Sequence, residues 1–267
     1  MPGYVQDAAP EQPLAFKRLL PTGDPIGVEE VVEGLSLAST SATRPYVLLN
    51  MVSTADGRAS LGGRSGPLGN QADRELFHGL RTAVDAVMAG AGTVRAERYR
   101  RLVRDERRRQ IRRERGLAEE PLACIVSGRL GLSADIPLLA DPQARVAIVT
   151  SSAASLPEDC AGKIDYIRAQ RDGVLDLPGA LAELRERFGV RTLLCEGGPH
   201  LNSHLLAAGL VDELFLSLSP KLAGDDAGGE ALRILSGSKL DSPVELELVA
   251  VLEHDSHLFL RYRVARS

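Results

Sequence analysis

Short apolar segments alternate with amphipathic segments along most of the chain. Compact runs of Val, Leu, Ile and Ala, bounded by Gly, Pro or Asp, are typical of buried strands. Such runs predict strands over residues 46–52, 84–90, 121–127, 145–150, 164–169, 191–198 and 211–220. Apolar residues at three- and four-residue steps predict helices after the cap Asn70, over residues 177–190 and over residues 199–210. Because strands alternate with helices, the pattern indicates an α/β fold with a mainly parallel central sheet flanked by helices.

The two ends of the chain depart from this alternation. Residues 244–265 alternate apolar and polar positions about a turn at 254–256, which predicts a C-terminal antiparallel hairpin at one edge of the sheet. Residues 1–44 are rich in Pro, Gly and acidic groups and carry only brief apolar patches. We therefore expect an irregular N-terminal arm over residues 1–44 and a single domain over residues 45–267.

One segment, residues 100–116, carries nine arginines and few apolar positions. Two interpretations are open. The segment could be a helix that binds anions or nucleic acid, or a solvated helix whose charges pair within it, for example Asp105 with Arg109 at four-residue spacing. A mostly polar helix without aromatic residues carries little specificity, so the second interpretation is favoured.

Composition narrows the classes of function. Lys and Arg total 32 against 36 for Asp and Glu, and the chain holds no Trp, 5 Phe and 5 Tyr, which argues against a nucleic-acid-binding module. The three cysteines, Cys124, Cys160 and Cys195, are far apart, which argues against a disulfide scaffold and for a reducing cytosol. No apolar stretch approaches the ~18 residues that cross a bilayer. The first residues do not resemble a secretion signal, so we expect a cytoplasmic protein without membrane contact.

Two of the predicted strand-to-helix junctions are rich in glycine. The first carries Gly90, Gly92 and Thr93, and the second carries Glu196, Gly197, Gly198 and Pro199. Glycine lets the backbone approach a ligand closely, and the first turn of a helix offers free N–H groups that favour phosphate. Pro199 suits a first helical position, where its missing N–H costs no hydrogen bond. Two such junctions in one sheet point to a dinucleotide, although Arg95 replaces the third glycine of the G-x-G-x-x-G motif.

A third strand end supports a phosphorylated dinucleotide. The strand over residues 121–127 is followed by Gly128 and Arg129, so that the Ser127 hydroxyl and a guanidinium stand close together in sequence. These groups suit the 2′-phosphate of NADPH, because Arg binds phosphate through two hydrogen bonds. No G-x-x-x-x-G-K-[ST] loop is present, and His200 and His204 lack the Glu of the H-E-x-x-H motif. We therefore expect neither a P-loop nor a metal.

Four segments in this order resemble one known family. NMVSTADGR, AGAGTVRAE, VSGRL and CEGGPHLNSHLLAAGLVDELFLSLSPKLAGDD are similar to the pyrimidine reductase of riboflavin biosynthesis. That reductase is often the C-terminal half of a bifunctional deaminase-reductase, and it has the dihydrofolate reductase-like fold. The resemblance runs from about residue 46 to the end of the chain. It implies a single dihydrofolate reductase-like domain that uses NADPH and forms a homodimer.

The resemblance also implies a role for each matching residue. On the cofactor side, it places Gly90, Gly92, Thr93 and Val94 against the NADPH phosphates from one direction, and Glu196, Gly197, Gly198 and Pro199 from the other. It places Ser127 and Arg129 on the 2′-phosphate and Thr150 beside the adenosine. On the substrate side, it places Asn50, Ser53, Asp56, Arg81 and Glu196.

The substrate side departs from the family pattern in three places. Asn50 stands where the family has Lys, and residues 65–69 (SGPLG) replace a segment that carries Trp and Thr. A segment associated with the ribose phosphate of the substrate appears here as AERYRRLVR, with Glu97 and Tyr99, in which Arg104 can still supply the distal cation. The H-x-E and P-C-x-x-C motifs of a deaminase are absent, so we expect a stand-alone reductase.

The reaction that follows is hydride transfer from NADPH to an electron-poor C=N carbon of a pyrimidine- or pterin-like substrate. The reduction of 5-amino-6-(5-phosphoribosylamino)uracil is the favoured example. Asp56 would place the proton that the product nitrogen needs, unless Asp56 and Gly57 only make a turn. Asn50 would bond the edge of the heterocycle or a neighbouring strand, and Glu196 would bind substrate or brace its glycine turn. The alternative functions are reduction of dihydrofolate or another pterin, and NADPH binding without catalysis.

Overall fold

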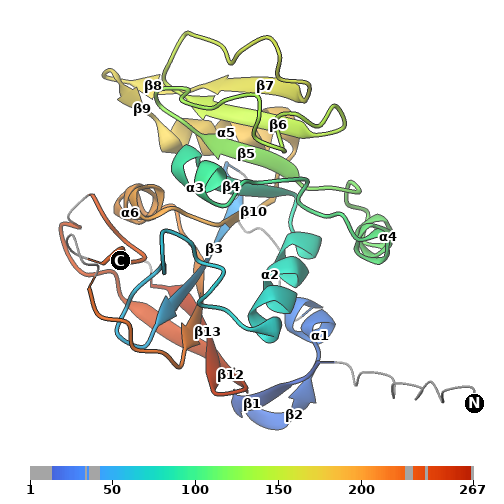
Figure 1. Ribbon diagram of the computed structural model, residues 1–267, viewed down its shortest axis with the longest axis vertical. Helices are drawn as coiled ribbons and strands as arrows, with labels where there is room; N and C mark the ends of the chain where they lie inside the picture. Colours follow the sequence, from blue (N-terminus) through green and yellow to red (C-terminus); the bar gives the residue numbers. More distant parts are fainter. Residues whose placement is uncertain (1–13, 34, 36–42, 226–230, 238–239, 266–267) are drawn as a thin grey trace, which may run out of the picture.

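A single mixed sheet forms the centre of the protein. The structure is a computed structural model that describes residues 14–33, 35, 43–225, 231–237 and 240–265. The eleven-stranded sheet has the order β2-β1-β12-β13-β11-β3-β10-β4-β5-β6-β7 (Figure 1). The strands from β11 to β7 in this order are parallel: β3 (Tyr46–Thr54), β4 (Ala86–Gly90), β5 (Leu122–Val126), β6 (Arg145–Thr150), β7 (Lys163–Arg168), β10 (Thr192–Cys195) and β11 (Glu213–Ser219). The predicted α/β class with a mainly parallel sheet is confirmed.

Helices cover both faces of the parallel strands. One hydrophobic cluster joins α1 (Val28–Glu33), α2 (Gln71–Ala83) and α3 (Ala91–Ala96) to alternate strand residues such as Val87. A second cluster joins α5 (Leu177–Phe188) and α6 (Pro199–Ala207) to the intervening residues, such as Met88. Because successive side chains of a strand point to opposite faces, both faces of the sheet are buried, and this explains the continuous apolar runs in the sequence.

The C-terminal hairpin is antiparallel, as predicted, but its predicted place at the edge of the sheet is wrong, because β1 and β2 extend the sheet beyond β12. β12 (Leu246–His254) and β13 (His257–Val264) are joined by Asp255 and Ser256, whose φ angles of 48° and 63° suit a two-residue hairpin turn. β13 pairs with the last parallel strand, β11. A separate two-stranded ladder, β8 (Gln170–Arg171) with β9 (Val174–Leu175), precedes α5.

The described part of the N-terminal segment is not irregular, which corrects the prediction for residues 1–44. β1 (Phe16–Leu20) pairs with β2 (Thr22–Ile26) and with β12, so the segment extends the main sheet (Figure 1). The Phe16 side chain is fully buried and packs edge-on against Phe259, with ring centroids 5.0 Å apart. The sequence signal was weak because both strands are short and β2 contains Pro, while their stabilising partner lies more than 200 residues away. Residues 1–13, 34 and 36–42 lie outside the described residues.

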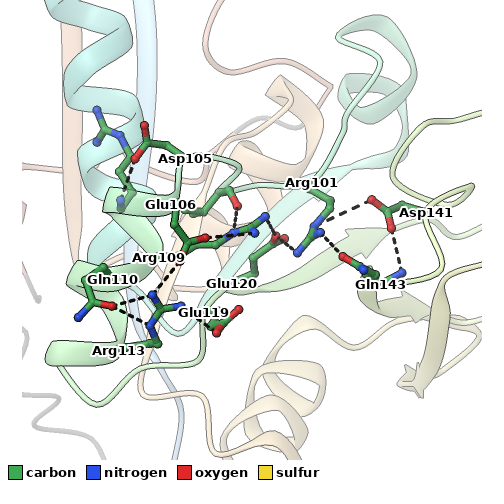
Figure 2. Close-up of polar contacts among 12 residues, drawn as sticks. Arg101, Asp105, Glu106, Arg109, Gln110, Arg113, Glu119, Glu120, Asp141 and Gln143 are labelled. Atoms are coloured by element: carbon green, nitrogen blue, oxygen red, sulfur yellow. Dashed lines mark hydrogen bonds and ion pairs between the residues drawn. The ribbon is translucent and has the colours of Figure 1, made fainter.

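The arginine-rich segment contains a short helix, α4 (Glu106–Glu114), as the favoured interpretation predicted. The expected ion pair of Asp105 with Arg109 is wrong in detail. The Asp105 carboxylate instead caps the helix by accepting a hydrogen bond from the Arg108 amide at 2.9 Å. Arg109 pairs with Glu120 at 2.9 Å and with Glu106 at 3.8 Å (Figure 2). The charges are thus paired largely with residues beyond the helix.

One arginine of this segment, Arg112, is completely buried. Its Nη1 donates to the carbonyl oxygens of Arg81 and Val84, each at 2.8 Å, and its Nε donates to the carbonyl of Ala118 at 2.7 Å. Burial lowers the pKa of Arg112 to about 10. A cation at the last turn of α2 satisfies carbonyls that have no partner within the helix, so Arg112 joins α4 to α2.

The fold brings the predicted site residues to one edge of the sheet. The carboxyl ends of β3, β4, β10, β5 and β6 lie side by side, since these strands are parallel neighbours. Ligands of open α/β sheets bind outside the carboxyl ends of the strands. Among the described residues, no helix is long and apolar enough to cross a bilayer.

Candidate active site

The two glycine junctions lie directly against each other. The Gly90 amide donates a hydrogen bond of 2.6 Å to the carbonyl oxygen of Gly197. A Cβ atom built on Gly198 would lie only 2.8 Å from Thr93 Oγ1, so a larger residue there would collide with α3. Gly197 has a φ of 85°, which favours glycine. The close approach of the two turns and the positive φ therefore explain the glycines of the second junction, Gly197 and Gly198, whereas a Cβ on Gly90 or Gly92 would meet no such contact.

A hollow of about 340 Å³ opens over these turns. We call it the glycine hollow, and its lining includes Gly90, Gly92, Thr93, Gly198 and Pro199. Gly90 caps α3 and Gly198 caps α6, and neither helix has a side-chain cap, so the first-turn N–H groups of α3, and those of α6 after Pro199, have no side-chain acceptor. The Val94 side chain, by contrast, is buried in the core, so only its backbone could reach a ligand.

The residues predicted for the 2′-phosphate and the adenosine lie further along the same edge. Ser127 follows β5 and is buried, and its amide donates to the Val149 carbonyl of β6 at 3.0 Å. Arg129 is exposed and has no ion pair or hydrogen bond within the described part of the chain. Thr150, the last residue of β6, is buried and accepts a hydrogen bond from the Ser152 amide at 3.0 Å. These three residues are near one another, but they do not line the glycine hollow.

A larger cleft of about 770 Å³ adjoins the glycine hollow, and Thr93, Glu97 and Glu196 line both. We call it the arginine cleft. Its lining includes four of the predicted substrate residues, namely Asn50, Arg81, Arg104 and Glu196. The predicted residues of the two glycine junctions and four of the predicted substrate residues thus lie in neighbouring spaces that share a wall.

A buried ionic cluster on the cleft side meets the shared wall at Glu196. Arg81 of α2 donates from Nε and Nη2 to the two carboxylate oxygens of Glu196, each at 2.7 Å. The Tyr99 hydroxyl donates to Glu196 Oε2 at 2.5 Å. Burial, followed by the charge of the neighbouring carboxylate, raises the pKa of Tyr99 well above 10. The three side chains hold one another in place, and the two roles expected of Glu196, substrate binding and bracing of its glycine turn, stay predictions.

Asp56 and Ser53 do not line the arginine cleft. The Asp56 carboxylate accepts hydrogen bonds from the Thr54 hydroxyl and from the Ala223 and Gly224 amides, at 2.5, 3.0 and 2.7 Å. These bonds, led by that of Thr54, lower the pKa of Asp56 to about 2. The structure therefore places Asp56 in a turn where it accepts hydrogen bonds from three donors, and its proposed part in proton transfer stays a prediction. Ser53 is buried within β3.

Sequence reasoning missed two carboxyl groups of the cleft. Asp73, in the first turn of α2, lines the arginine cleft, and burial raises its pKa. Glu97 accepts hydrogen bonds from the Ser65 amide and hydroxyl at 2.9 and 3.0 Å. Glu97 was visible in the sequence as a departure from the family pattern, but nothing in the spacing indicated that α2 would also contribute a carboxyl group.

Three arginines of the cleft have no ion pair or hydrogen bond among the described residues. The side chains of Arg74, Arg100 and Arg104 line the space and make no ion pair or hydrogen bond to any other described residue. Three others, Arg98, Arg101 and Arg108, are paired with carboxylates. An anion entering the cleft would therefore meet three guanidinium groups that need not first break an ion pair.

Comparison with known proteins identifies the family. The model of the RibD C-terminal domain matches residues 45–260. A 2,5-diamino-6-ribosylamino-4(3H)-pyrimidinone 5′-phosphate reductase of Archaeoglobus fulgidus is 32% identical over 185 residues, which cover 68% of this chain and 83% of that protein. The protein of the same name from Methanothermobacter thermautotrophicus is 28% identical over 230 residues, which cover 83% and 99%.

A solved structure has the same fold. The crystal structure of a pyrimidine reductase-like protein from Corynebacterium diphtheriae superimposes with a TM-score of 0.72 at 24% identity, over 91% of this chain and 100% of that one. The resemblance based on the four sequence segments is thereby confirmed. The chain belongs to the RibD C-terminal domain family.

Proposed function

We propose that this chain is an NADPH-dependent reductase of riboflavin biosynthesis that reduces a ribosylaminopyrimidine 5′-phosphate. The observation that carries the proposal is that the glycine hollow and the arginine cleft adjoin each other and suit different parts of the reaction. The glycine hollow offers open helix N-termini, and the arginine cleft next to it offers three unpaired guanidinium groups. A dinucleotide in the first space and a phosphorylated substrate in the second would meet at the wall formed by Thr93, Glu97 and Glu196.

The glycine hollow suits a dinucleotide. The turns at Gly90 and Gly198 place no side chain at the cap positions of α3 and α6, so a phosphate could approach the backbone N–H groups of both first turns, in α6 those that follow Pro199. Bound NADPH would supply the hydride. Ser127 and Arg129 would receive its 2′-phosphate, and Thr150 would lie by its adenosine. The exposed Arg129 has the freedom to turn toward that phosphate.

The arginine cleft suits a substrate with a flat ring and a distal phosphate. Arg74, Arg100 and Arg104 would bind the phosphate, since each is without an ion pair in the described part of the chain. The Asn50 amide, on the inner side of the cleft, would bond the edge of the heterocycle. The cluster of Arg81, Glu196 and Tyr99 would act as a rigid wall that aligns substrate with cofactor and keeps water out.

The proton that completes the reduction has a better source than Asp56. A carboxyl group with a lowered pKa is ionised at neutral pH and has no proton to give. Asp73 lines the cleft, and burial raises its pKa, so it holds a proton closer to neutral pH. We therefore assign the placement of the proton to Asp73, while Asp56 would stabilise the turn after β3.

The test is an assay of NADPH oxidation with three substrates. We expect turnover with the diamino pyrimidinone ribosyl phosphate or with its deaminated form, and little with dihydrofolate, which has no phosphate for the three arginines. Saturation with cofactor at 100 times its dissociation constant should raise the stability by about 2.7 kcal/mol. Stabilisation without turnover of any of the three would indicate a binding protein and overturn the proposal. Turnover of dihydrofolate alone would move the protein to the alternative reaction.

We further propose a cytoplasmic homodimer. Leu246 and Leu248 of β12 are 40% and 42% exposed, as is Leu20 of β1 at 42%, so apolar side chains gather along this part of the sheet. Cys124 and Cys195 are buried free thiols, which fits a reducing compartment. Light scattering should give twice the chain mass, and Leu248→Glu should lower that value; a monomeric wild type would contradict the dimer.

A further inference from the structure

The arginine-rich segment divides into two sets of side chains with different surroundings. Arg100 and Arg104 are exposed, line the arginine cleft and have no partner among the described residues. Arg101, at the border of the cleft, and Arg109 and Arg113 instead belong to a network of carboxylates and amides (Figure 2). The unpaired and the paired arginines alternate along one short stretch, so the paired ones can fix the backbone that carries the others.

Glu120 is the centre of this network. Its Oε1 contacts Arg109 Nη2 at 2.9 Å and also contacts Arg101 Nη2 (Figure 2). The three side chains are only 17–20% exposed, so their charges are poorly screened by water. Glu120 stands two residues before β5, an interior strand that pairs with β4 and β6. It therefore links the arginines to the main sheet.

Both partners of Glu120 hold the segment over residues 98–105. Arg109 Nε donates to the Val103 carbonyl at 3.0 Å, next to Arg104. Arg101 belongs to the segment itself, and its Nη1 donates to Gln143 Oε1 at 2.5 Å. Each anchored position is adjacent in sequence to one of the unpaired arginines, so a shift of either anchor would move a guanidinium group of the cleft.

The neighbouring carboxylate, Glu119, has a different position. Its side chain is 58% exposed and pairs at 2.9 Å with Arg113, which is 38% exposed and also pairs with Glu106. Neither Glu119 nor Arg113 contacts the 98–105 segment in the described structure. Exposed pairs of this kind contribute little to stability, whereas removal of one partner from a mostly buried pair leaves an uncompensated charge. Substitution of Glu119 can therefore serve as the control for substitution of Glu120.

We propose that Glu120 is a positioning residue for the phosphate end of the arginine cleft. By holding Arg101 and Arg109, it keeps the 98–105 segment in the conformation in which Arg100 and Arg104 both face the phosphate of the substrate. The inference rests on the proposed function, because it takes the anion of the cleft to be a ribose phosphate. It assigns Glu120 a role in affinity for the phosphorylated ligand, with no contact to substrate or cofactor.

The experiment compares Glu120→Gln with Glu119→Gln in the full chain. Binding of ribose 5-phosphate, ribose and NADPH is measured by calorimetry, together with KM and kcat for the pyrimidine substrate. For Glu120→Gln we expect about tenfold weaker binding of ribose 5-phosphate and a KM raised to match, as is usual for coupled residues of one network. The variant should retain its affinity for NADPH and nearly all of its kcat. Glu119→Gln should resemble the wild type in every measurement.

The outcomes separate this inference from the proposed function. If the wild type fails to bind ribose 5-phosphate more tightly than ribose, the phosphate end itself is misassigned and both proposals fail. If the wild type binds it and Glu120→Gln binds it equally well, the positioning role is wrong and the proposed function stands. Loss of NADPH affinity in the same proportion would reveal general unfolding and also overturn the role. If Glu120→Gln does not fold, Arg109→Gln serves in its place, because it removes a partner of Glu120. It should show the same selective loss of affinity for ribose 5-phosphate.

Discussion

Replacement of Arg81 by Met is the most informative perturbation of the shared wall. The Glu196 side chain is only 3% exposed, and Arg81 supplies two of its three hydrogen bonds. Met has the length to fill the space of the Arg81 stem but cannot neutralise the carboxylate. In the variant, the Glu196 carboxylate thus stays buried and charged, and the Tyr99 hydroxyl is the hydrogen-bond donor left to it among the described residues.

The expected loss is a large fraction of the folding free energy. Removal of one partner from a buried ion pair costs about 3–5 kcal/mol, and domains are stable by about 5–15 kcal/mol. For a chain of this size, the melting temperature should fall by about 6–20 °C. Glu196→Gln should cost about 2–3 kcal/mol. The loss is smaller because the Arg81 guanidinium keeps the Leu102 carbonyl at 3.3 Å and lies 4.1 Å from the centre of the Phe77 ring.

The assay is urea unfolding of the wild type, the two single variants and the double variant Arg81→Met/Glu196→Gln. Because the double variant removes both charges, it should be more stable than the sum of the single losses predicts, with a coupling of about 2 kcal/mol. A loss below about 1 kcal/mol for Arg81→Met, or strictly additive losses, would refute the reasoning that this pair is buried and mutually dependent. Affinity for NADPH, measured in parallel, should change less than the stability.

Three further predictions concern single residues. Arg129→Ala should lower the affinity for NADPH much more than that for NADH, and equal losses in titrations with both cofactors would remove the 2′-phosphate assignment. The pKa of Asp56 is lowered from 3.8 to about 2, so its stabilisation of the fold is complete above pH 3.8 and is lost as the pH falls through about 2. Unfolding curves of wild type and Asp56→Asn should therefore converge over this range, and unchanged turnover in the variant would exclude Asp56 from proton transfer. Asp73→Asn should lower kcat and abolish the fall of kcat at high pH. The reason is that burial raises the pKa of the Asp73 carboxyl group, from which the proton is transferred. A pH–rate profile like that of the wild type would argue against this role.

Short-range signals made much of the fold predictable. Apolar runs marked the parallel strands, Asn70 and Gly189 marked helix ends, and the turn after His254 marked the hairpin. The glycine junctions could also be predicted, because each places a strand end, a glycine and a helix start within a few residues. Segment 14–33 was missed because its strand β1 depends on a partner near the other end of the chain.

The candidate site was predicted as a set of residues but not as a set of contacts. Arg81 and Glu196 were both expected to face the substrate, yet they pair with each other across 115 positions of sequence. Tyr99, which completes the cluster, was visible as a departure from the family pattern, but no spacing rule links it to Glu196. Asp73 lies in the cleft because α2 packs beside β3, and that arrangement depends on the whole sheet.

The pairing of β1 with β12 has a practical consequence for shortened forms of this protein. The RibD C-terminal domain match begins at residue 45, so a chain cut there would lack β1, β2 and α1. The backbone N–H and C=O groups at Val251–Glu253 of β12 that now pair with β1 would face solvent, on the strand that also carries the half-exposed Leu246 and Leu248. Open strand edges with apolar neighbours recruit further strands from other molecules. Such a trimmed protein should precipitate or form fibrils on storage, whereas one that begins before Phe16 should stay dispersed.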